Sequence, residues 1–363
     1  MKEKLNQYHI AILIYMTQSG IVIFSLPRLV AENFGTNGWY VLVIISLLVT
    51  CNIFLMQLVY RFGKGSSVFD ILEQRIPLAV LSPIYILLAL FWAYLGCLVG
   101  KQYILILQML AFPTTNPMVF KFIFDFMALI LISKQIYNIT KAATVFFYLT
   151  IWMVFVFFFH FPEFSWLRLT PFIGYGGIGG LESWLEIYIA FLGYEVCLFL
   201  IPYVPEKTKV FKAVYIGNFF LTFIYLFICV IGFGFFSFGQ LTNLVYPLLD
   251  MLAYLQLPFI ERIENFLFTL FLFKVLMTTV IYFWIAKITL SRVFRKVKST
   301  WLDLSVVVVS YGLSLIPQVI SEVERLLRML GYTQIVIVYV FPLLLLAVIA
   351  LNRMSNRRRE NPS

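Results

Sequence analysis

The hydrophobic and polar positions of this chain alternate on the scale of whole membrane spans. Windows of about 20 apolar residues, the length that crosses a bilayer as a helix, recur about ten times along its 363 residues. This pattern predicts an all-α integral membrane protein of about ten transmembrane helices. We expect the amphipathic stretch 241–264 to form a structured loop at the membrane surface. The predicted spans are 8–31, 38–60, 79–109, 117–133, 142–159, 182–204, 213–238, 266–290, 301–320 and 334–351.

The first and the sixth span are interrupted near their middles. The first contains Gln18, Ser19 and Gly20, and the sixth contains Gly193 and Glu195. An unpaired backbone group costs several kcal/mol in hydrocarbon, so a broken span persists only where it lines a cavity or is buried in protein. Glycines in membrane helices also serve ordinary close packing, but the paired placement of glycines and polar residues favours a binding site.

Basic residues gather on one side of the predicted bundle. If the N-terminus is placed inside, most of the 27 lysine and arginine residues fall on the inner side, including those of segments 287–298 and 353–359. Cytoplasmic loops carry such an excess, so both termini are predicted to be cytoplasmic, with 352–363 forming a basic tail. The first span is too long for the apolar region of a signal peptide, and we expect it to remain as a helix.

The topology then predicts a repeat. With ten spans and an inside N-terminus, spans one and six cross the membrane in opposite directions. We therefore expect one polytopic domain over 1–363, built as a five-plus-five inverted-repeat transporter fold with broken helices 1 and 6. Its repeats would cover about 8–160 and 182–351. In transporters of this kind the ligand site lies near the midplane, where the interrupted helices meet.

The two breaks offer complementary chemistry. The free N–H groups of the half-helix that begins near Gly20 would attract a carboxylate, because they form the positive end of its dipole. The carbonyls of residues 191–194, with Glu195 close by, would accept hydrogen bonds from an ammonium group. A zwitterionic amino acid fits this pair of ends.

Four ionisable residues lie inside predicted spans: Lys101, Asp125, Glu195 and Lys274. Each costs about 2.5–3.5 kcal/mol at the centre of a membrane helix on insertion scales, so each is a functional candidate. We expect ion pairs among them, with Lys101 and Asp125 as charge partners, although the sequence leaves the pairing open. Glu195 would act in the site or pair with a lysine. Lys101 or Lys274 would alternatively supply the fixed positive charge that replaces a sodium ion in proton-linked carriers.

Composition excludes several other classes of protein. Hydrophobic residues make up 62% of the chain and charged residues 12%, against roughly 25% charged residues in soluble domains. The net charge of +10 is spread over short loops, so we predict no nucleic-acid partner. The four cysteines stand singly in apolar spans, which argues against a disulfide framework or a zinc site; they are Cys51, Cys97, Cys197 and Cys229.

The remaining motifs predict no chemistry. Residues 174–179 match G-x-G-x-x-G, but a dinucleotide site needs a preceding strand, and a hinge or outer gate is the better interpretation. His9 and His160 lie near opposite membrane faces, too far apart to share a metal ion. No catalytic arrangement is present. We therefore expect no enzyme, no cofactor and no metal site.

The order and spacing of several short segments resemble a known family. The chain opens with Gln7-Tyr8-His9, continues with Gln18-Ser19-Gly20 and Ser25-Leu26-Pro27-Arg28, and later carries Arg61-Phe62-Gly63 and Gly193-Tyr194-Glu195. Together they resemble the B subunit of bacterial spore germinant receptors, over essentially the whole chain. The resemblance implies a permease-like subunit of the amino acid/polyamine/organocation transporter superfamily in the spore inner membrane.

The resemblance also implies a function and a site. The chain would bind a small nutrient germinant, often an amino acid, and trigger germination together with an A subunit and a lipoprotein C subunit. An autonomous proton-coupled amino acid or polyamine transporter in the bacterial cell membrane is the alternative function. The ligand-binding residues implied around spans one, three, six and eight are Gln18, Ser19, Gly20, Ile21, Phe24, Tyr94, Leu98, Phe191, Gly193, Tyr194, Glu195 and Lys274.

Overall fold

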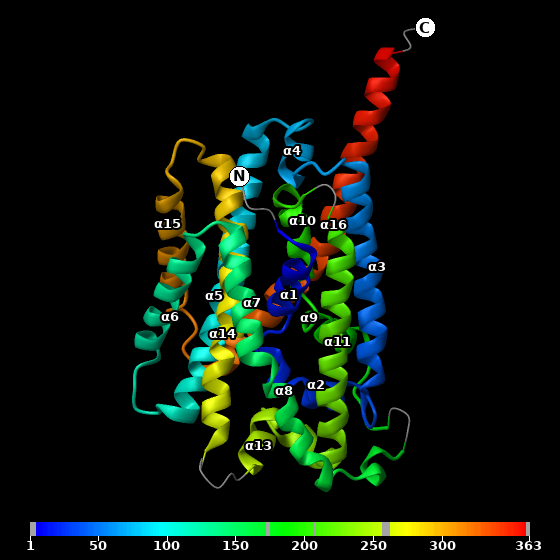
Figure 1. Ribbon diagram of the computed structural model, residues 1–363, viewed down its shortest axis with the longest axis vertical. Coiled ribbons are helices and arrows are strands. Elements are labelled where there is room, and N and C mark those ends of the chain that lie inside the picture. Colours follow the sequence, from blue (N-terminus) through cyan, green and yellow to red (C-terminus); the bar gives the residue numbers. More distant parts are fainter. Residues whose placement is uncertain (1–4, 172–174, 206–207, 256–261, 361–363) are drawn as a thin grey trace.

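Helices form nearly all of the ordered structure of this protein (Figure 1). The computed structural model describes residues 5–171, 175–205, 208–255 and 262–360, and these ranges contain no strand. The helices run mostly along one direction and form a single elongated bundle (Figure 1). The all-α fold predicted from the apolar spans is therefore confirmed.

The first span is broken where the sequence predicts. Helix α1 (Gln7–Gln18) ends before Ser19 and Gly20, a short 3₁₀ helix η1 (Ile21–Phe24) follows, and α2 (Leu26–Phe34) completes the span. Gly20 is extended, with φ −79° and ψ −171°. Pro27 lies in the first turn of α2, where its missing N–H costs no helical hydrogen bond.

The sixth span is broken as well. Helix α9 (Leu181–Ile189) is followed by a turn, and then by η4 (Tyr194–Val196), α10 (Cys197–Leu200) and η5 (Ile201–Tyr203). The two halves of the span meet at a bend of 58°. Gly193 stands at the bend with φ +121°, a left-handed conformation that favours glycine because it has no Cβ.

Helices also occupy the eight other predicted spans. Six single helical segments are long and apolar enough to cross a membrane, and the bent sixth span adds a seventh; the count of ten spans stays a prediction. The helical elements of these spans are α3 (Tyr40–Phe62), α5 (Leu78–Ala111), α6 (Pro117–Ile132), α7 (Ile136–Ile151), α8 (Met153–Val156), η2 (Phe157–Glu163), α11 (Val210–Phe235), α14 (Ile263–Val293), α15 (Ser299–Leu313) and α16 (Ile320–Glu360).

The boundary between the last two spans differs from the prediction. Helix α15 ends at Leu313, and α16 begins at Ile320 rather than near residue 334. The first turns of α16 carry Glu322, Glu324, Arg325 and Arg328. These charges lower the hydropathy of the segment and hide its helical character from a search for apolar windows.

Short elements cover the two ends of the bundle. Helix α4 (Val68–Glu73) lies at the same end as the start of α1 and the end of α16, whereas α13 (Pro247–Tyr254) lies at the other end (Figure 1). Helix α13 and α12 (Phe238–Asn243) form the structured part of the predicted loop 241–264. Residues 256–261 of this loop lie outside the described residues.

The glycine-rich segment before the sixth span packs against the first. Ile178 and Gly179 donate backbone hydrogen bonds to Glu32 O and Asn33 O, at 3.0 and 2.9 Å. A Cβ on Gly177 would lie 2.6 Å from Gly35 N, so the two backbones approach as closely as glycine allows. The first glycine of the G-x-G-x-x-G motif, Gly174, lies outside the described residues.

Candidate functional site

The two helix breaks meet in the centre of the bundle. Gln18 Nε2 donates a hydrogen bond of 2.7 Å to Phe191 O, and so joins the end of α1 directly to the bend of the sixth span. A Cβ on Gly193 would lie only 3.0 Å from Gln18 N and from Thr17 O. Tyr225 OH of α11 donates to Ala190 O at 3.1 Å. The interrupted segments are therefore neighbours held by specific polar contacts.

A cavity of about 180 Å³ opens beside this junction. Its wall includes residues from both breaks, with Gln18, Gly20 and Ile21 on one side and Ala190 and Leu192 on the other. The other lining residues come from the first span and from α5, α9, α14 and α16, and they are Thr17, Val22, Ser25, Arg28, Leu29, Leu95, Val99, Gln102, Glu186, Ile189, Thr278, Tyr282, Glu324, Leu327, Arg328 and Gly331. The lining is apolar with a few convergent polar groups, as is usual for small-molecule sites.

The predicted site residues divide into three groups. Gln18, Gly20 and Ile21 line the cavity. Several others are buried beside it without lining it, and they are Ser19, Phe191, Gly193, Tyr194 and Glu195. Phe24 and Lys274 line a second cavity, and Tyr94 and Leu98 face a different helix surface. The structure thus brings the residues of the two breaks together, but only some of them line the larger cavity.

The two residues proposed on the third span, Tyr94 and Leu98, do not line this cavity. Leu95, Val99 and Gln102 of α5 line the cavity, whereas Leu98 packs with Val323 of α16 in a separate apolar cluster that also includes Tyr94. One residue along an α-helix turns the side chain by about 100°. Position alone could not fix this rotation, because apolar residues surround α5 on all faces.

One of the carbonyls predicted to accept an ammonium group, and a neighbouring carbonyl, already accept hydrogen bonds from side chains. Phe191 O already accepts from Gln18, and Ala190 O accepts from Tyr225. Glu195 is 4% exposed and forms no ion pair among the described residues. Its carboxylate accepts hydrogen bonds from Gly193 N at 2.7 Å and from two side chains, Tyr282 OH at 3.0 Å and Gln334 Nε2 at 2.8 Å.

Lys274 is buried on α14 without a carboxylate partner in the described part of the chain. Its ammonium donates to Tyr15 OH at 2.8 Å and lies 5.0 and 5.4 Å from the ring centres of Tyr15 and Phe271. It lines a second, smaller cavity of about 30 Å³ together with Phe24. Because Thr278 follows one turn later on the same face of α14 and lines the larger cavity, Lys274 stands next to the candidate site and outside it.

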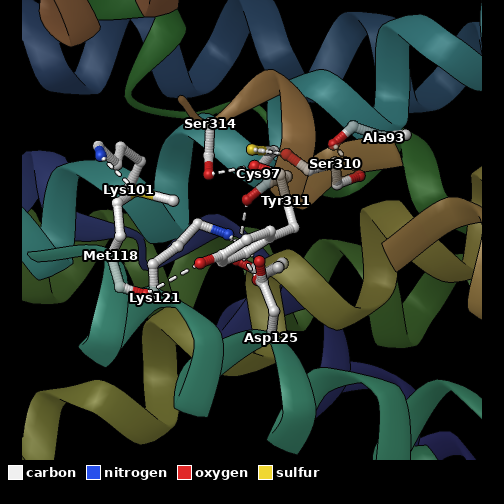
Figure 2. A network of polar contacts seen from close by, with 11 residues as sticks. Ala93, Cys97, Lys101, Met118, Lys121, Asp125, Ser310, Tyr311 and Ser314 are labelled. Carbon is white, nitrogen blue, oxygen red and sulfur yellow. Dashed lines mark hydrogen bonds and ion pairs between the residues drawn. The ribbon is translucent and has the colours of Figure 1, made fainter. Parts of the chain in front are cut away.

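Lys101 and Asp125, the two expected charge partners, do not pair with each other. Asp125 pairs with Lys121 on its own helix, with the two groups 2.5 Å apart and both side chains almost completely buried. Figure 2 shows these two side chains pointing toward each other, while the Lys101 ammonium turns away toward Met118. The Lys101 Nζ lies 3.1 Å from Met118 Sδ. Residues four apart on a helix face each other, and this spacing was the available signal for Lys121.

Two ion pairs were also not predicted from the sequence. One joins α14 to α15, and the other lies at the cavity. Lys287 Nζ lies 2.6 Å from Asp303 Oδ1, so the ninth predicted span carries a buried acid. Arg328 pairs with Glu186 at 2.9 Å where both line the cavity. The charges of α16 fell in a predicted loop, and for this reason they were not considered for the site.

Sequence comparisons agree with this arrangement. The pattern of the family described as spore germination protein matches residues 4–323. The chain belongs to the spore germination protein family. Its relatives include spore germination protein A2 of Bacillus subtilis (strain 168), which is 24% identical over 357 residues and 96% of each chain. Spore germination protein B2 of the same organism is 22% identical over 93% of each chain.

Solved transporters share the fold of this spore germination family member. A nucleobase-cation-symport-1 family transporter, MHP1 with bromovinylhydantoin bound, has a TM-score of 0.63 and 15% identity over 91% of this chain and 75% of its own. MhsT in complex with L-phenylalanine has a TM-score of 0.63 and 12% identity, covering 96% of this chain and 89% of its own. The transporter fold predicted from the paired breaks is thereby confirmed, and the protein is a multi-pass membrane protein.

Proposed function

We propose that this chain is the permease-like subunit of a spore germinant receptor and binds a small nutrient, an amino acid, between the two helix breaks. The observation that carries the proposal is the cavity beside Gln18 and Gly20, where the interrupted first and sixth spans meet. Binding there would change the relative stability of two conformations, provided that the ligand has different affinities for them.

The proposal includes partners and a location. An A subunit and a lipoprotein C subunit would receive the signal in the inner membrane of the spore. Both termini and the basic segment 352–363 would face the cytoplasm, so that the cavity opens toward the opposite end of the bundle. The single domain would consist of repeats over about 8–160 and 182–351, each of which begins with a broken span. Family membership and the basic loops support this arrangement.

Gly20 provides the sharpest test of the site. A Cβ at Gly20 would meet no heavy atom within 4 Å, and its extended backbone accepts any residue. Gly20→Leu should therefore project a side chain into the cavity without disturbing the fold. In spores that depend on this chain for one nutrient, we expect the germination rate with that nutrient to fall at least about tenfold, because the substituted side chain fills the space.

Gly312→Leu is the matched control for this test. Gly312 lies on α15, also with no heavy atom within 4 Å of an added Cβ, and it does not line the cavity. We expect germination to stay within about twofold of the unchanged protein, as is usual for surface substitutions. Equal amounts of both variants in the spore membrane, measured by immunoblot, are required. Normal germination with Gly20→Leu would overturn the proposed site.

A second candidate function is an autonomous amino acid or polyamine carrier coupled to protons. Its support is the likeness to solved transporters together with buried Lys274, which has no carboxylate partner in the described ranges. Vesicles that contain only this chain distinguish the two functions. Proton-driven uptake of a labelled amino acid, lost with Gly20→Leu, would favour the carrier, whereas binding without uptake favours the receptor subunit.

A further inference from the structure

The hydroxyl groups of the cavity wall have already donated their hydrogens. Thr17 Oγ1 donates to Leu13 O, one turn earlier on α1, at 2.8 Å. Thr278 Oγ1 on α14 donates its one hydrogen to backbone carbonyls, with Met16 O and Thr17 O of α1 at 3.3 and 3.2 Å and Lys274 O, one turn earlier on α14, at 3.3 Å. A hydroxyl has one hydrogen and two lone pairs, so each of these groups can offer the cavity only an acceptor.

The same is true of two further hydroxyls. Tyr282 OH donates to Glu195 Oε1 at 3.0 Å. The Glu195 carboxylate also accepts hydrogen bonds from two other groups, so it acts as the acceptor of the Tyr282 bond as well. Ser25 Oγ donates to Val22 O at 3.2 Å. Tyr282 and Ser25 both line the cavity.

Gln18 completes the pattern. Its Nε2 donates to Phe191 O at 2.7 Å and to Asn218 Oδ1 at 3.3 Å, so both amide hydrogens have acceptors. The reversed amide would place its oxygen against the Phe191 carbonyl, which has no hydrogen to give, and this fixes the orientation. Gln18 Oε1 is buried and has no hydrogen-bond partner among the described residues, so a lone acceptor remains beside the cavity.

The cavity therefore has unlike ends. Its inner wall is formed by Thr17, Gln18, Thr278 and Tyr282. The hydroxyl and amide hydrogens of these side chains are already used in other hydrogen bonds, so the side chains can only accept. The arginines stand toward the outer end, where Arg28 lies in the first turn of α2 and Arg328 pairs with Glu186. The carboxylate of Glu324, which also lines the cavity, accepts a hydrogen bond from Tyr246 OH. Arg28 Nε has no hydrogen-bond partner in the described structure, and the nearest carboxylate, Glu32, is 3.9 Å away.

We propose that the inner wall selects the ligand by its primary ammonium group, held against Gln18, Thr278 and Tyr282, and that any carboxylate points outward toward Arg28. An ammonium has three hydrogens to donate and no lone pair, which complements a wall made of acceptors. At these three side chains a carboxylate would face oxygen lone pairs alone. This inference rests on the proposed function, because it assigns ligand chemistry to the same cavity.

Ligand analogues provide the first test. The purified full-length chain in detergent is screened by thermal shift with the 20 common amino acids. The amino acid that binds best is then compared with its decarboxylated amine and with the carboxylic acid that lacks the amino group. A site built around hydrogen bonds strongly rejects an analogue that lacks the bonded group. We expect the amine to bind within about tenfold of the amino acid, and the acid to bind at least about 100-fold more weakly.

A pair of variants tests the acceptor wall itself. Thr278→Val removes the oxygen while keeping the shape, and Thr278→Ser keeps the oxygen. We expect Thr278→Val to weaken binding of the amine at least about tenfold and Thr278→Ser to change it less than about threefold, in keeping with the loss of one hydrogen bond to a charged group. Equal melting temperatures of the unliganded variants establish that both fold.

Each other outcome overturns the inference. Binding of the acid as tight as that of the amino acid would remove the ammonium assignment, as would the failure of every amine to bind. Stabilisation by sodium or potassium chloride alone would assign the acceptors to an inorganic cation. If the acid binds and Gly20→Leu abolishes its binding, only the ammonium assignment falls. If Gly20→Leu leaves binding of the amino acid intact, the proposed site itself falls.

Discussion

At the scale of single residues, buried charges are stabilised in three different ways. Asp125 has a lysine on its own helix, Glu195 has three neutral hydrogen-bond donors, and Lys274 has a tyrosine hydroxyl and two aromatic rings. The sequence predicted that these three residues lie inside spans. It could not predict the partners, because hydrogen bonds from Tyr282 or Gln334 come from residues about 90 to 140 positions away, and neutral partners leave no charge pattern.

The buried pair of Lys121 and Asp125 leads to a first prediction. Asp125→Asn leaves a buried ammonium without its counter-charge, which typically costs about 3–5 kcal/mol. We expect this loss in the free energy of unfolding, measured by chemical denaturation of the purified protein. The double variant Lys121→Met with Asp125→Leu should recover most of it, because the replacements are apolar and of similar volume.

The pair of Arg28 and Glu32 is the control for this prediction. It has the same i,i+4 spacing, but the groups are 3.9 Å apart and the side chains are 21% and 32% exposed. Glu32→Gln should cost less than about 1 kcal/mol, because solvent screens exposed pairs. A loss for Asp125→Asn no larger than that for Glu32→Gln would show that the buried pair contributes little to stability.

At the scale of elements, the existence of helices was easier to predict than their rotation or their ends. The apolar windows located a helical element in every predicted span. On α5, however, Val99 rather than the proposed Leu98 lines the cavity, because a helix that is apolar on all sides gives no sequence signal of which face borders the cavity. The start of α16 was missed since four charged residues within its first turns resemble a loop.

Helix α4 leads to a second prediction, because its attachment combines an apolar and a charged contact. Phe69 is 5% exposed and packs edge-on against Tyr85, with ring centres 5.4 Å apart, and near Phe199 of the sixth span. Glu73 pairs with Arg295 beyond the end of α14 at 2.8 Å, where the arginine side chain is 59% exposed. We expect Phe69→Ala to cost about 3–5 kcal/mol, as is typical for a buried phenylalanine.

Hydrogen exchange over residues 68–73 measures this effect locally. Arg295→Ala is the comparison, and it should change the exchange protection by less than about 1 kcal/mol, because the ion pair is exposed. Faster exchange in Arg295→Ala than in Phe69→Ala would show that charge, rather than apolar packing, holds α4 against the bundle. Phe199 belongs to α10, in the second half of the broken sixth span, so α4 packs directly against that half.

At the scale of the whole molecule, the candidate site depends on how two distant segments meet. The paired breaks were visible in the sequence, and the structure places them in contact through Gln18 and Phe191, 173 positions apart. The sequence did not predict the part of the cavity wall formed by Arg328 and Glu186, because these two residues come together only when α16 packs beside α9. Residue types and spacings thus predicted the two breaks, and the packing of separate helices determined which residues line the cavity beside them.

The two glycines at the breaks should therefore respond differently to the same substitution. Gly193 has φ +121° and touches the end of α1, so that an added Cβ would lie 3.0 Å from Gln18 N and Thr17 O. Gly193→Ala should cost about 1–3 kcal/mol in backbone strain alone and should push the two breaks apart. Gly20→Ala meets no atom within 4 Å and has an extended backbone, so we expect it to be neutral or stabilising by up to about 1 kcal/mol.

Melting temperatures of the two alanine variants, measured with and without the amino acid that binds best, test this difference. Gly193→Ala should lower the melting temperature and also reduce the stabilisation by ligand, because the Gln18 side chain that joins the breaks is displaced. Gly20→Ala should keep the melting temperature while its added methyl group reduces only the ligand effect. Similar losses of stability in both variants would mean that other contacts in the bundle stabilise the junction of the two breaks. The hydrogen bond between Gln18 and Phe191 would then contribute little to it.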